Sequence, residues 1–157
     1  MMVRHKGFTL IEMLVVVAIV SILATIGLPL TEIAQRRNQE ESLRLSLREI
    51  RSALDAYKKA MDQGRILRSV GETGYPANLE VLVTGVVDAQ SPRGERIYFL
   101  RTLPRDPFAP PETPAAETWA LRSYDSPPDD PQPGRDVFDV HSKSTALGLN
   151  GVAYRLW

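Results

Sequence analysis

The first part of the chain is dominated by an apolar run from Phe8 to Leu30, which a single ionisable residue, Glu12, interrupts. As an α-helix with a rise of about 1.5 Å per residue, this run would be about 35 Å long. That length is enough to cross the hydrocarbon core of a bilayer. The pattern therefore predicts a membrane-spanning helix over residues 8–30.

Beyond Leu30 the pattern becomes amphipathic, because apolar residues recur at spacings of three and four. It predicts that the helix continues over residues 31–63 and ends at Gly64. The stripe extends over barely three heptads, which favours packing against the chain's own sheet over a coiled-coil seam. Glu40 and Arg44, four residues apart, are expected to pair on the solvated face. The stripe consists of Leu43, Leu47, Ile50, Leu54, Tyr57 and Met61.

Residues 64–157 contain short apolar segments between loops rich in Gly and Pro, and we expect them to form a globular head. Asn78 is placed to cap a short helix that ends before Gly85. The prolines of the run 103–108 exclude regular structure there.

Residues 119–124 and 137–142 have the composition of strands, and the alternation in 151–157 predicts a third strand. An acidic, proline-dense loop, 125–136, separates the first two. The expected fold is α+β: a long N-terminal helix whose second half packs on a small C-terminal antiparallel sheet.

Glu12 needs an explanation, because a carboxylate inside a bilayer costs about 2.5 to 3.5 kcal/mol. A cut after Gly7 would create a positively charged amine on Phe8, four residues before Glu12. At about 4 Å and an effective dielectric near 20, the pair is worth on the order of 4 kcal/mol. The same attraction can act between neighbouring chains that are shifted by about one helical turn.

The residues Lys6-Gly7-Phe8-Thr9-Leu10-Ile11-Glu12 and the apolar run after them resemble the N-terminal signal of type IV pilins and type II secretion pseudopilins. The resemblance implies that a prepilin peptidase removes residues 1–7 and methylates the new N-terminal Phe8. Glu12 then matches the family's acidic residue, with an assembly role for Glu12 and Phe8. An uncleaved signal anchor is the alternative, and it leaves Glu12 without a role.

Parts of the head resemble the major pseudopilin of type II secretion systems. Tyr75-Pro76 before a short helix and the run 103–108 carry this resemblance. The chain departs from that pattern at residues 108–111, where Phe-Ala-Pro-Pro stands in place of a tryptophan-glycine-x-proline-tyrosine segment. The absence of cysteine also favours the pseudopilin branch.

The resemblance implies a structural subunit of a type II secretion pseudopilus, anchored in the bacterial inner membrane with its head in the periplasm. Arg4 and Lys6 precede the apolar run and agree with a cytoplasmic N-terminus. The implied partners are copies of the chain, other pseudopilins, the inner-membrane assembly platform and the peptidase. A type IV pilus subunit for adhesion, motility or DNA uptake is the alternative, and a single-pass anchored binding domain is an alternative of another class.

Gly27 and Pro29 predict a weak point late in the apolar run, because Pro29 lacks an amide proton and its ring clashes with the carbonyl one turn back. Two interpretations stay open. The weak point bends the helix to fit the bilayer, or, as the resemblance implies, it unwinds when subunits pack into a filament.

The composition disfavours nucleic-acid binding and catalysis. The chain has 19 basic and 19 acidic residues, so no excess of positive charge marks a nucleic-acid surface. It contains no cysteine and no G-x-S-x-G motif, and its histidine in the head, His141, lies in an expected strand. We expect no enzymatic activity and no cofactor.

Calcium is the metal that the resemblance raises, because major pseudopilins hold this ion in a C-terminal loop. Five carboxylates without EF-hand spacing lie in the corresponding part of the chain. A solvated acidic loop is the simpler interpretation, and a calcium site is the alternative. The candidate ligands are Asp125, Asp129, Asp130, Asp136 and Asp139.

Overall fold

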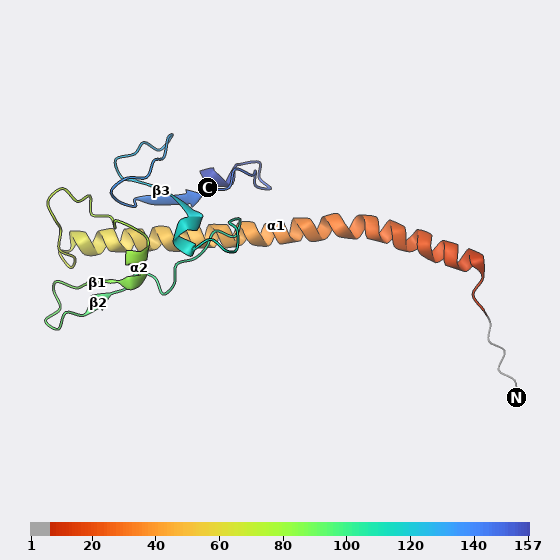
Figure 1. Cartoon of the computed structure of the whole chain (residues 1–157), viewed down its shortest axis with the longest axis horizontal. Coiled ribbons are helices and arrows are strands. Elements are labelled where there is room, and N and C mark those ends of the chain that lie inside the picture. Colours follow the sequence, from red (N-terminus) through yellow and green to blue (C-terminus); the bar gives the residue numbers. More distant parts are fainter. Residues whose placement is uncertain (1–6) are drawn as a thin grey trace, which may run out of the picture. The chain divides into compact units, whose positions relative to one another are not determined.

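Helix α1, Leu10–Asp62, is the longest element of the computed structural model, which describes residues 7–157 apart from the side chains of residues 25–30 (Figure 1). The chain divides into two compact units, Met1–Asn38 and Gln39–Trp157. The second unit, called the head from here on, therefore already includes the second half of α1. The long helix of the expected α+β fold is confirmed.

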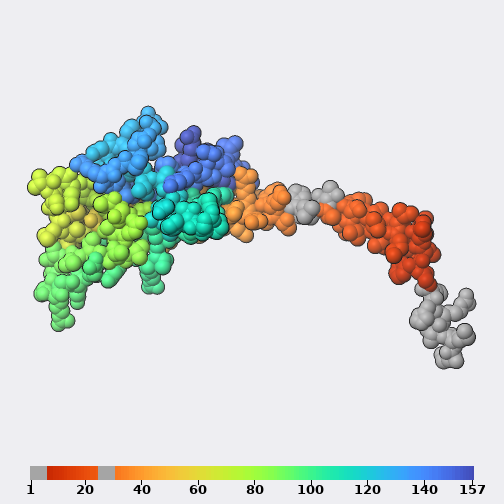
Figure 2. Space-filling model, viewed as in Figure 1, coloured from red at the N-terminus to blue at the C-terminus, as the bar shows by residue number. Residues whose placement is uncertain are grey.

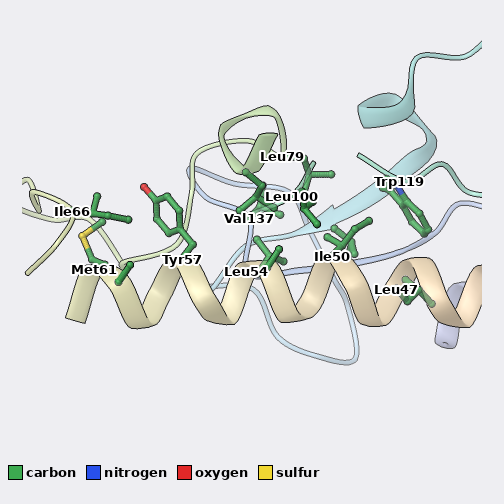
Figure 3. Close-up of a cluster of buried hydrophobic side chains, with 14 of the residues drawn as sticks. Leu47, Ile50, Leu54, Tyr57, Met61, Ile66, Leu79, Leu100, Trp119 and Val137 are labelled. Atoms are coloured by element: carbon green, nitrogen blue, oxygen red, sulfur yellow. The ribbon is translucent and has the colours of Figure 1, made fainter. Parts of the chain in front are cut away.

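The predicted apolar stripe of α1 forms the floor of the head's core. Leu43 and Ile50 are completely buried, and Leu54 is 1% exposed. Figure 3 shows stripe side chains such as Ile50, Leu54 and Tyr57 pointing from α1 toward side chains from later parts of the chain. The residues that cover the stripe include Ile66, Leu79, Leu100, Trp119 and Val137.

Gly64 ends α1 as the sequence predicts. Its φ of 70° lies in the left-handed region, which glycine adopts without steric cost. The Gly64 amide donates to the Met61 carbonyl at 3.0 Å, and the Arg65 amide donates to the Ala60 carbonyl at 2.9 Å. This pair of hydrogen bonds is a Schellman motif, which satisfies carbonyls at the end of the helix.

The short helix α2, Glu80–Thr84, follows the loop after α1. The Val81 amide donates to Asn78 Oδ1 at 3.1 Å, which confirms the expected role of Asn78. Gly85 follows the helix with a φ of 72°, and a side chain there would approach the Ile97 carbonyl oxygen to 2.7 Å. Glycine is therefore required where α2 turns into the next strand.

Two separate two-stranded antiparallel sheets complete the head. Strands β1, Val86–Val87, and β2, Arg96–Ile97, form one sheet. Strands β3, Trp119–Arg122, and β4, Asp139–Ser142, form the other, with Trp119 opposite Ser142 and Arg122 opposite Asp139. A short 3₁₀ helix, η1, Ala115–Thr118, leads into β3.

The predicted third strand over residues 151–157 is wrong. This segment contains the 3₁₀ helix η2, Tyr154–Leu156, and a single β-bridge between Leu147 and Ala153. One apolar position of the alternation, Tyr154, is instead buried by ring packing: it is completely buried and stacks on Phe108 with a centroid separation of 4.1 Å. Leu156, expected on the same face as Tyr154, is 69% exposed.

The expected pair of Glu40 and Arg44 is also wrong. Glu40 is buried, and its Oε1 accepts hydrogen bonds from the Leu149 amide at 2.6 Å and the Tyr154 hydroxyl at 2.9 Å. The Arg44 guanidinium instead lies over the Trp157 ring, 4.4 Å from its centroid. Glu40 therefore attaches the C-terminal segment to α1.

Asp106 connects the proline-containing run 103–108 to the second sheet. Its carboxylate accepts from the Ser142 hydroxyl at 2.5 Å and from the Phe108 amide at 2.8 Å. The Asp106 amide donates to the Thr118 hydroxyl at 3.2 Å. Because Asp106 is only 3% exposed, the bonds from Ser142 and Phe108 replace the hydration that its carboxylate loses on burial.

Asp136 joins three segments of the head in a similar way. Its carboxylate accepts from the Ser123 hydroxyl at 2.7 Å, the Tyr124 amide at 2.9 Å and the Thr73 hydroxyl. Burial alone would raise the pKa of Asp136, but these hydrogen bonds and the nearby Arg135 outweigh burial and lower the pKa below its ordinary value. The ionised form therefore stabilises the fold.

Along the first part of α1, the large apolar side chains from Leu10 to Leu23 are all exposed, by 51% to 81%. Among the described residues, no helix combines the length and the apolar character that a membrane crossing requires. The structure therefore does not confirm the membrane span expected over residues 8–30.

Replacing Leu54 with Ala should destabilise the head, because the substitution leaves a cavity between α1 and the residues above it. We expect the free energy of unfolding to fall by about 2 to 5 kcal/mol. Both tryptophans, Trp119 and Trp157, lie in the head. Their fluorescence during urea unfolding of the full chain in detergent micelles therefore measures the free energy of unfolding of the head. Leu45→Ala is the matched control: Leu45 is 53% exposed, and its loss should cost less than about 0.5 kcal/mol. Equal losses for both variants would contradict the buried stripe.

Replacing Asp136 with Asn should destabilise the head at neutral pH by about 2 kcal/mol, since three hydrogen bonds to a charged acceptor are weakened. The folded pKa lies below the unfolded value, so the carboxylate's stabilisation is complete above about pH 4. It is lost as the pH falls through the folded pKa. Urea unfolding at pH 7 and at acidic pH should therefore show that the difference between wild type and Asp136→Asn shrinks on acidification. The exposed Asp129→Asn is the control, and a pH-independent difference for Asp136→Asn would contradict the assignment.

Candidate processing and assembly site

The backbone around the expected cleavage bond is accessible. Gly7, Phe8 and Thr9 precede the first helical residue, Leu10, and all three are exposed. A side-chain atom added at Gly7 would meet nothing within 4 Å. Exposed, non-helical backbone is where proteases cut, so the Gly7–Phe8 bond has the local structure that processing needs. Residues 1–6, which include Arg4 and Lys6, lie outside the described part of the chain.

Thr9 and Glu12 bind each other at the start of α1. The Thr9 amide and the Thr9 hydroxyl both donate to Glu12 Oε2 at 2.8 Å. The Glu12 amide lies 3.3 Å from the Thr9 hydroxyl oxygen, which accepts from it. This reciprocal arrangement is a capping box, in which the N-cap residue and the third helical residue satisfy each other's amides.

The capping box explains why α1 begins at Leu10 and how Glu12 is held before any other chain is present. Only Oε2 of Glu12 takes part in hydrogen bonds among the described residues, so Oε1 can accept from a further donor. The structure thus places Glu12 one turn from Phe8 with one oxygen directed by Thr9. The role of Phe8 and Glu12 in assembly stays a prediction.

Thr9 is the residue of this site that our sequence analysis missed. The signal was present, because Thr9-Leu10-Ile11-Glu12 has the S/T-x-x-E spacing of a capping box directly before an apolar helix. Glu12 therefore has a local role as a helix cap in addition to its charge.

The weak point expected at Gly27 and Pro29 lies in residues 25–30, outside the side chains that the structure describes. It therefore stays a prediction.

The five acidic residues considered as calcium ligands have separate surroundings. Asp139 pairs with Arg51 at 2.8 Å, and Asp125 pairs with Arg135 at 2.9 Å. Asp136 is buried in its own hydrogen bonds, as described above. No group of three or more acidic or histidine side chains that could hold a metal occurs in the described part of the chain. Calcium binding by this loop stays an untested hypothesis.

Asp129 and Asp130 are the two candidates that face solvent without an ion pair among the described residues. Asp130 accepts a hydrogen bond from the Gln132 side chain at 2.9 Å. Prolines 127, 128, 131 and 133 surround this pair of carboxylates.

His141 lies in β4 opposite Ala120, which confirms its place in a strand. Its Nδ1 lies 3.3 Å from the Ser142 carbonyl oxygen, and its buried Nε2 has no hydrogen-bond partner in the described part of the chain. The Ser142 hydroxyl donates to Asp106 and accepts from the Ser144 amide, so Ser142 and His141 do not form a nucleophile–base pair.

Comparison with known proteins agrees with this N-terminal geometry. Residues 2–28 match the family described as the prokaryotic N-terminal methylation motif. The type II secretion system core protein G of Aeromonas hydrophila is 30% identical over 112 residues, which cover 69% of this chain and 71% of that protein. No solved structure is significantly similar to the chain. A methylation motif at the capped start of a long helix, together with this relative, shows that the chain belongs to the family of type IV pilins and type II secretion pseudopilins.

Proposed function

We propose that this protein is a structural subunit of a type II secretion pseudopilus. Processed copies leave the inner membrane and stack through their N-terminal helices into a periplasmic fibre that drives protein export. The observation that carries the proposal is the length of the similarity to core protein G. It extends over 112 residues, whereas the methylation motif covers only residues 2–28. The similarity therefore includes residues of the head, where pseudopilins and pilins differ.

The exposed apolar surface of the first unit supports an assembly role. Between Leu10 and Leu23 every large apolar side chain is at least half exposed. A continuous apolar surface of this kind needs a nonaqueous partner. In the proposal, lipid covers residues 8–30 before assembly, and the helices of neighbouring copies cover them afterwards.

Glu12 and Phe8 determine the stagger between copies in this proposal. Removal of residues 1–7 turns the Phe8 amide into a charged amine, while the Thr9–Glu12 capping box keeps its hydrogen bonds. The free Oε1 of Glu12 then accepts from the Phe8 amine of an adjacent copy. The attraction, on the order of 4 kcal/mol at an effective dielectric near 20, offsets the burial cost of the carboxylate.

Mass spectrometry of the mature N-terminus tests the processing step. We expect the chain in a native host to begin with N-methylated Phe8. In a strain without prepilin peptidase, the same chain should keep its leader. An intact leader in the wild-type strain would instead support a signal anchor with a membrane-bound binding domain.

Replacing Glu12 with Gln should reduce fibre assembly by more than about tenfold, since a loss of about 1.4 kcal/mol already corresponds to that factor. The Gln side-chain oxygen can still accept from Thr9, so the substitution removes the charge and keeps the cap. The measurement is the quantity of subunit in sheared fibres, with normal processing checked by mass. Glu32→Gln, at an exposed α1 position, is the control. A normally processed Glu12→Gln variant with wild-type fibre yield would refute the proposed pairing.

Deleting the gene separates a secretion role from a pilus role. The proposal expects loss of exoprotein export and unchanged twitching motility. Lost twitching with normal export would assign the chain to a type IV pilus.

A further inference from the structure

A groove on the head is lined by three arginines from one face of α1. Arg44, Arg48 and Arg51 are spaced by four and three residues, so they project from the same side of the helix. The groove has a volume of about 490 Å³, and Leu47, Val152 and Trp157 form its apolar part. We call it the arginine groove.

Two of the three arginines keep their charge uncompensated. Arg51 pairs with Asp139 and donates to the main-chain oxygens of Val140 at 3.1 Å and Trp157 at 2.9 Å. Arg44 is exposed over the Trp157 ring. Arg48 is also exposed and makes a long hydrogen bond of 3.4 Å to the Arg44 carbonyl. Neither Arg44 nor Arg48 forms an ion pair with any residue that the structure describes.

The loop 127–133, Pro-Pro-Asp-Asp-Pro-Gln-Pro, has the complementary chemistry. Its two carboxylates, Asp129 and Asp130, are exposed, and Figure 2 shows this part of the chain in blue at the upper edge of the head. Four prolines restrict its backbone, so little conformational entropy is lost when it binds. Proline-rich segments dock on aromatic side chains, and carboxylates form paired hydrogen bonds with arginine.

The loop does not occupy the groove of its own chain. It lines a different hollow, together with Arg122 and Arg155. This hollow shares only Arg51 and Trp157 with the arginine groove. Within the described residues, neither Asp129 nor Asp130 pairs with these arginines. Both the loop and the groove are therefore available to a second copy of the chain.

We propose that the acidic proline loop of one copy binds the arginine groove of the next, with Asp129 and Asp130 against Arg44 and Arg48 and the prolines on Trp157. In the proposed arrangement the contact is heterologous: each copy gives its loop to one neighbour and its groove to the other, which leaves a free loop and a free groove at the two ends of an assembly. It can therefore repeat along a fibre. The inference rests on the proposed fibre. It adds a contact between the heads of neighbouring copies to the proposed contact between their N-terminal helices.

Cross-linking in fibres tests the contact directly, because the chain contains no cysteine of its own. Copies carrying Arg48→Cys and differently tagged copies carrying Asp129→Cys are expressed together in the native host. A short bismaleimide is used, since an Arg–Asp pair holds its backbones farther apart than a disulfide permits. We expect a cross-linked dimer that contains both tags. Exposed Arg93 lies on the β1–β2 hairpin, and Arg93→Cys paired with Asp129→Cys should give none.

Charge reversal gives an independent readout. Arg48→Glu should lower fibre yield by about tenfold, equivalent to about 1.4 kcal/mol, and adding Asp129→Arg to the same chain should restore most of it. Arg93→Glu makes the same charge change elsewhere and should leave the yield unchanged. Higher salt should weaken the wild-type contact, because exposed ion pairs are screened.

Four results would overturn the inference. The first is that the mixed cysteine copies form fibres at wild-type yield but do not cross-link. This result leaves the proposed function intact. The second is a cross-link that forms only inside a chain carrying both cysteines. The third is a loss of yield with Arg48→Glu that Asp129→Arg does not restore, as expected if the groove binds a phospholipid headgroup. The fourth is a wild-type chain that forms no fibre, which would refute the proposed function as well.

Discussion

The burial of one apolar stripe on α1 holds the head together. Each sheet has only two strands, and a two-stranded sheet is marginally stable in water without a further packing surface. The stripe supplies that surface, because it contacts residues from α2, from β3 and from the loops between them. Loss of the helix surface would therefore remove the support of both sheets.

Three buried carboxylates connect segments that the apolar core alone does not position. Glu40 binds the C-terminal segment, Asp106 binds β4 and η1, and Asp136 binds the end of β3 and the loop after α1. Buried charges are tolerated when hydrogen bonds replace their hydration. In a chain without cysteine, these hydrogen-bonded carboxylates connect distant segments, as disulfides do in many small secreted domains.

The same helix thus serves two purposes in different parts of its length. Its first part begins with the Thr9–Glu12 capping box and exposes apolar side chains, whereas its second part buries its apolar side chains in the head. Under the proposed function, substitutions near Glu12 affect assembly without unfolding the head. Substitutions in the stripe should unfold the head first. The arginine groove is lined by exposed arginines of the second part, where the proposed contact between copies would depend on charge and not on the core.

The sequence alone determined the features that depend on neighbours within about one helical turn. The buried stripe, the end of α1 at Gly64, the cap at Asn78 and the two strands β3 and β4 all follow from local periodicity and backbone chemistry. The N-terminal motif was equally local, and its family assignment is confirmed. The S/T-x-x-E spacing of Thr9 and Glu12 also predicts the cap at Thr9, which our sequence analysis missed.

Only the tertiary structure decided where Glu40, Tyr154 and the arginines point. Glu40 has the spacing of a helix-surface pair with Arg44, but its partners, Leu149 and Tyr154, are more than 100 positions away. Tyr154 follows a strand-like alternation, yet it packs as part of a 3₁₀ helix on Phe108. Periodicity records which residues prefer burial, whereas the partner that buries them is determined by packing between distant segments, which local spacing does not encode.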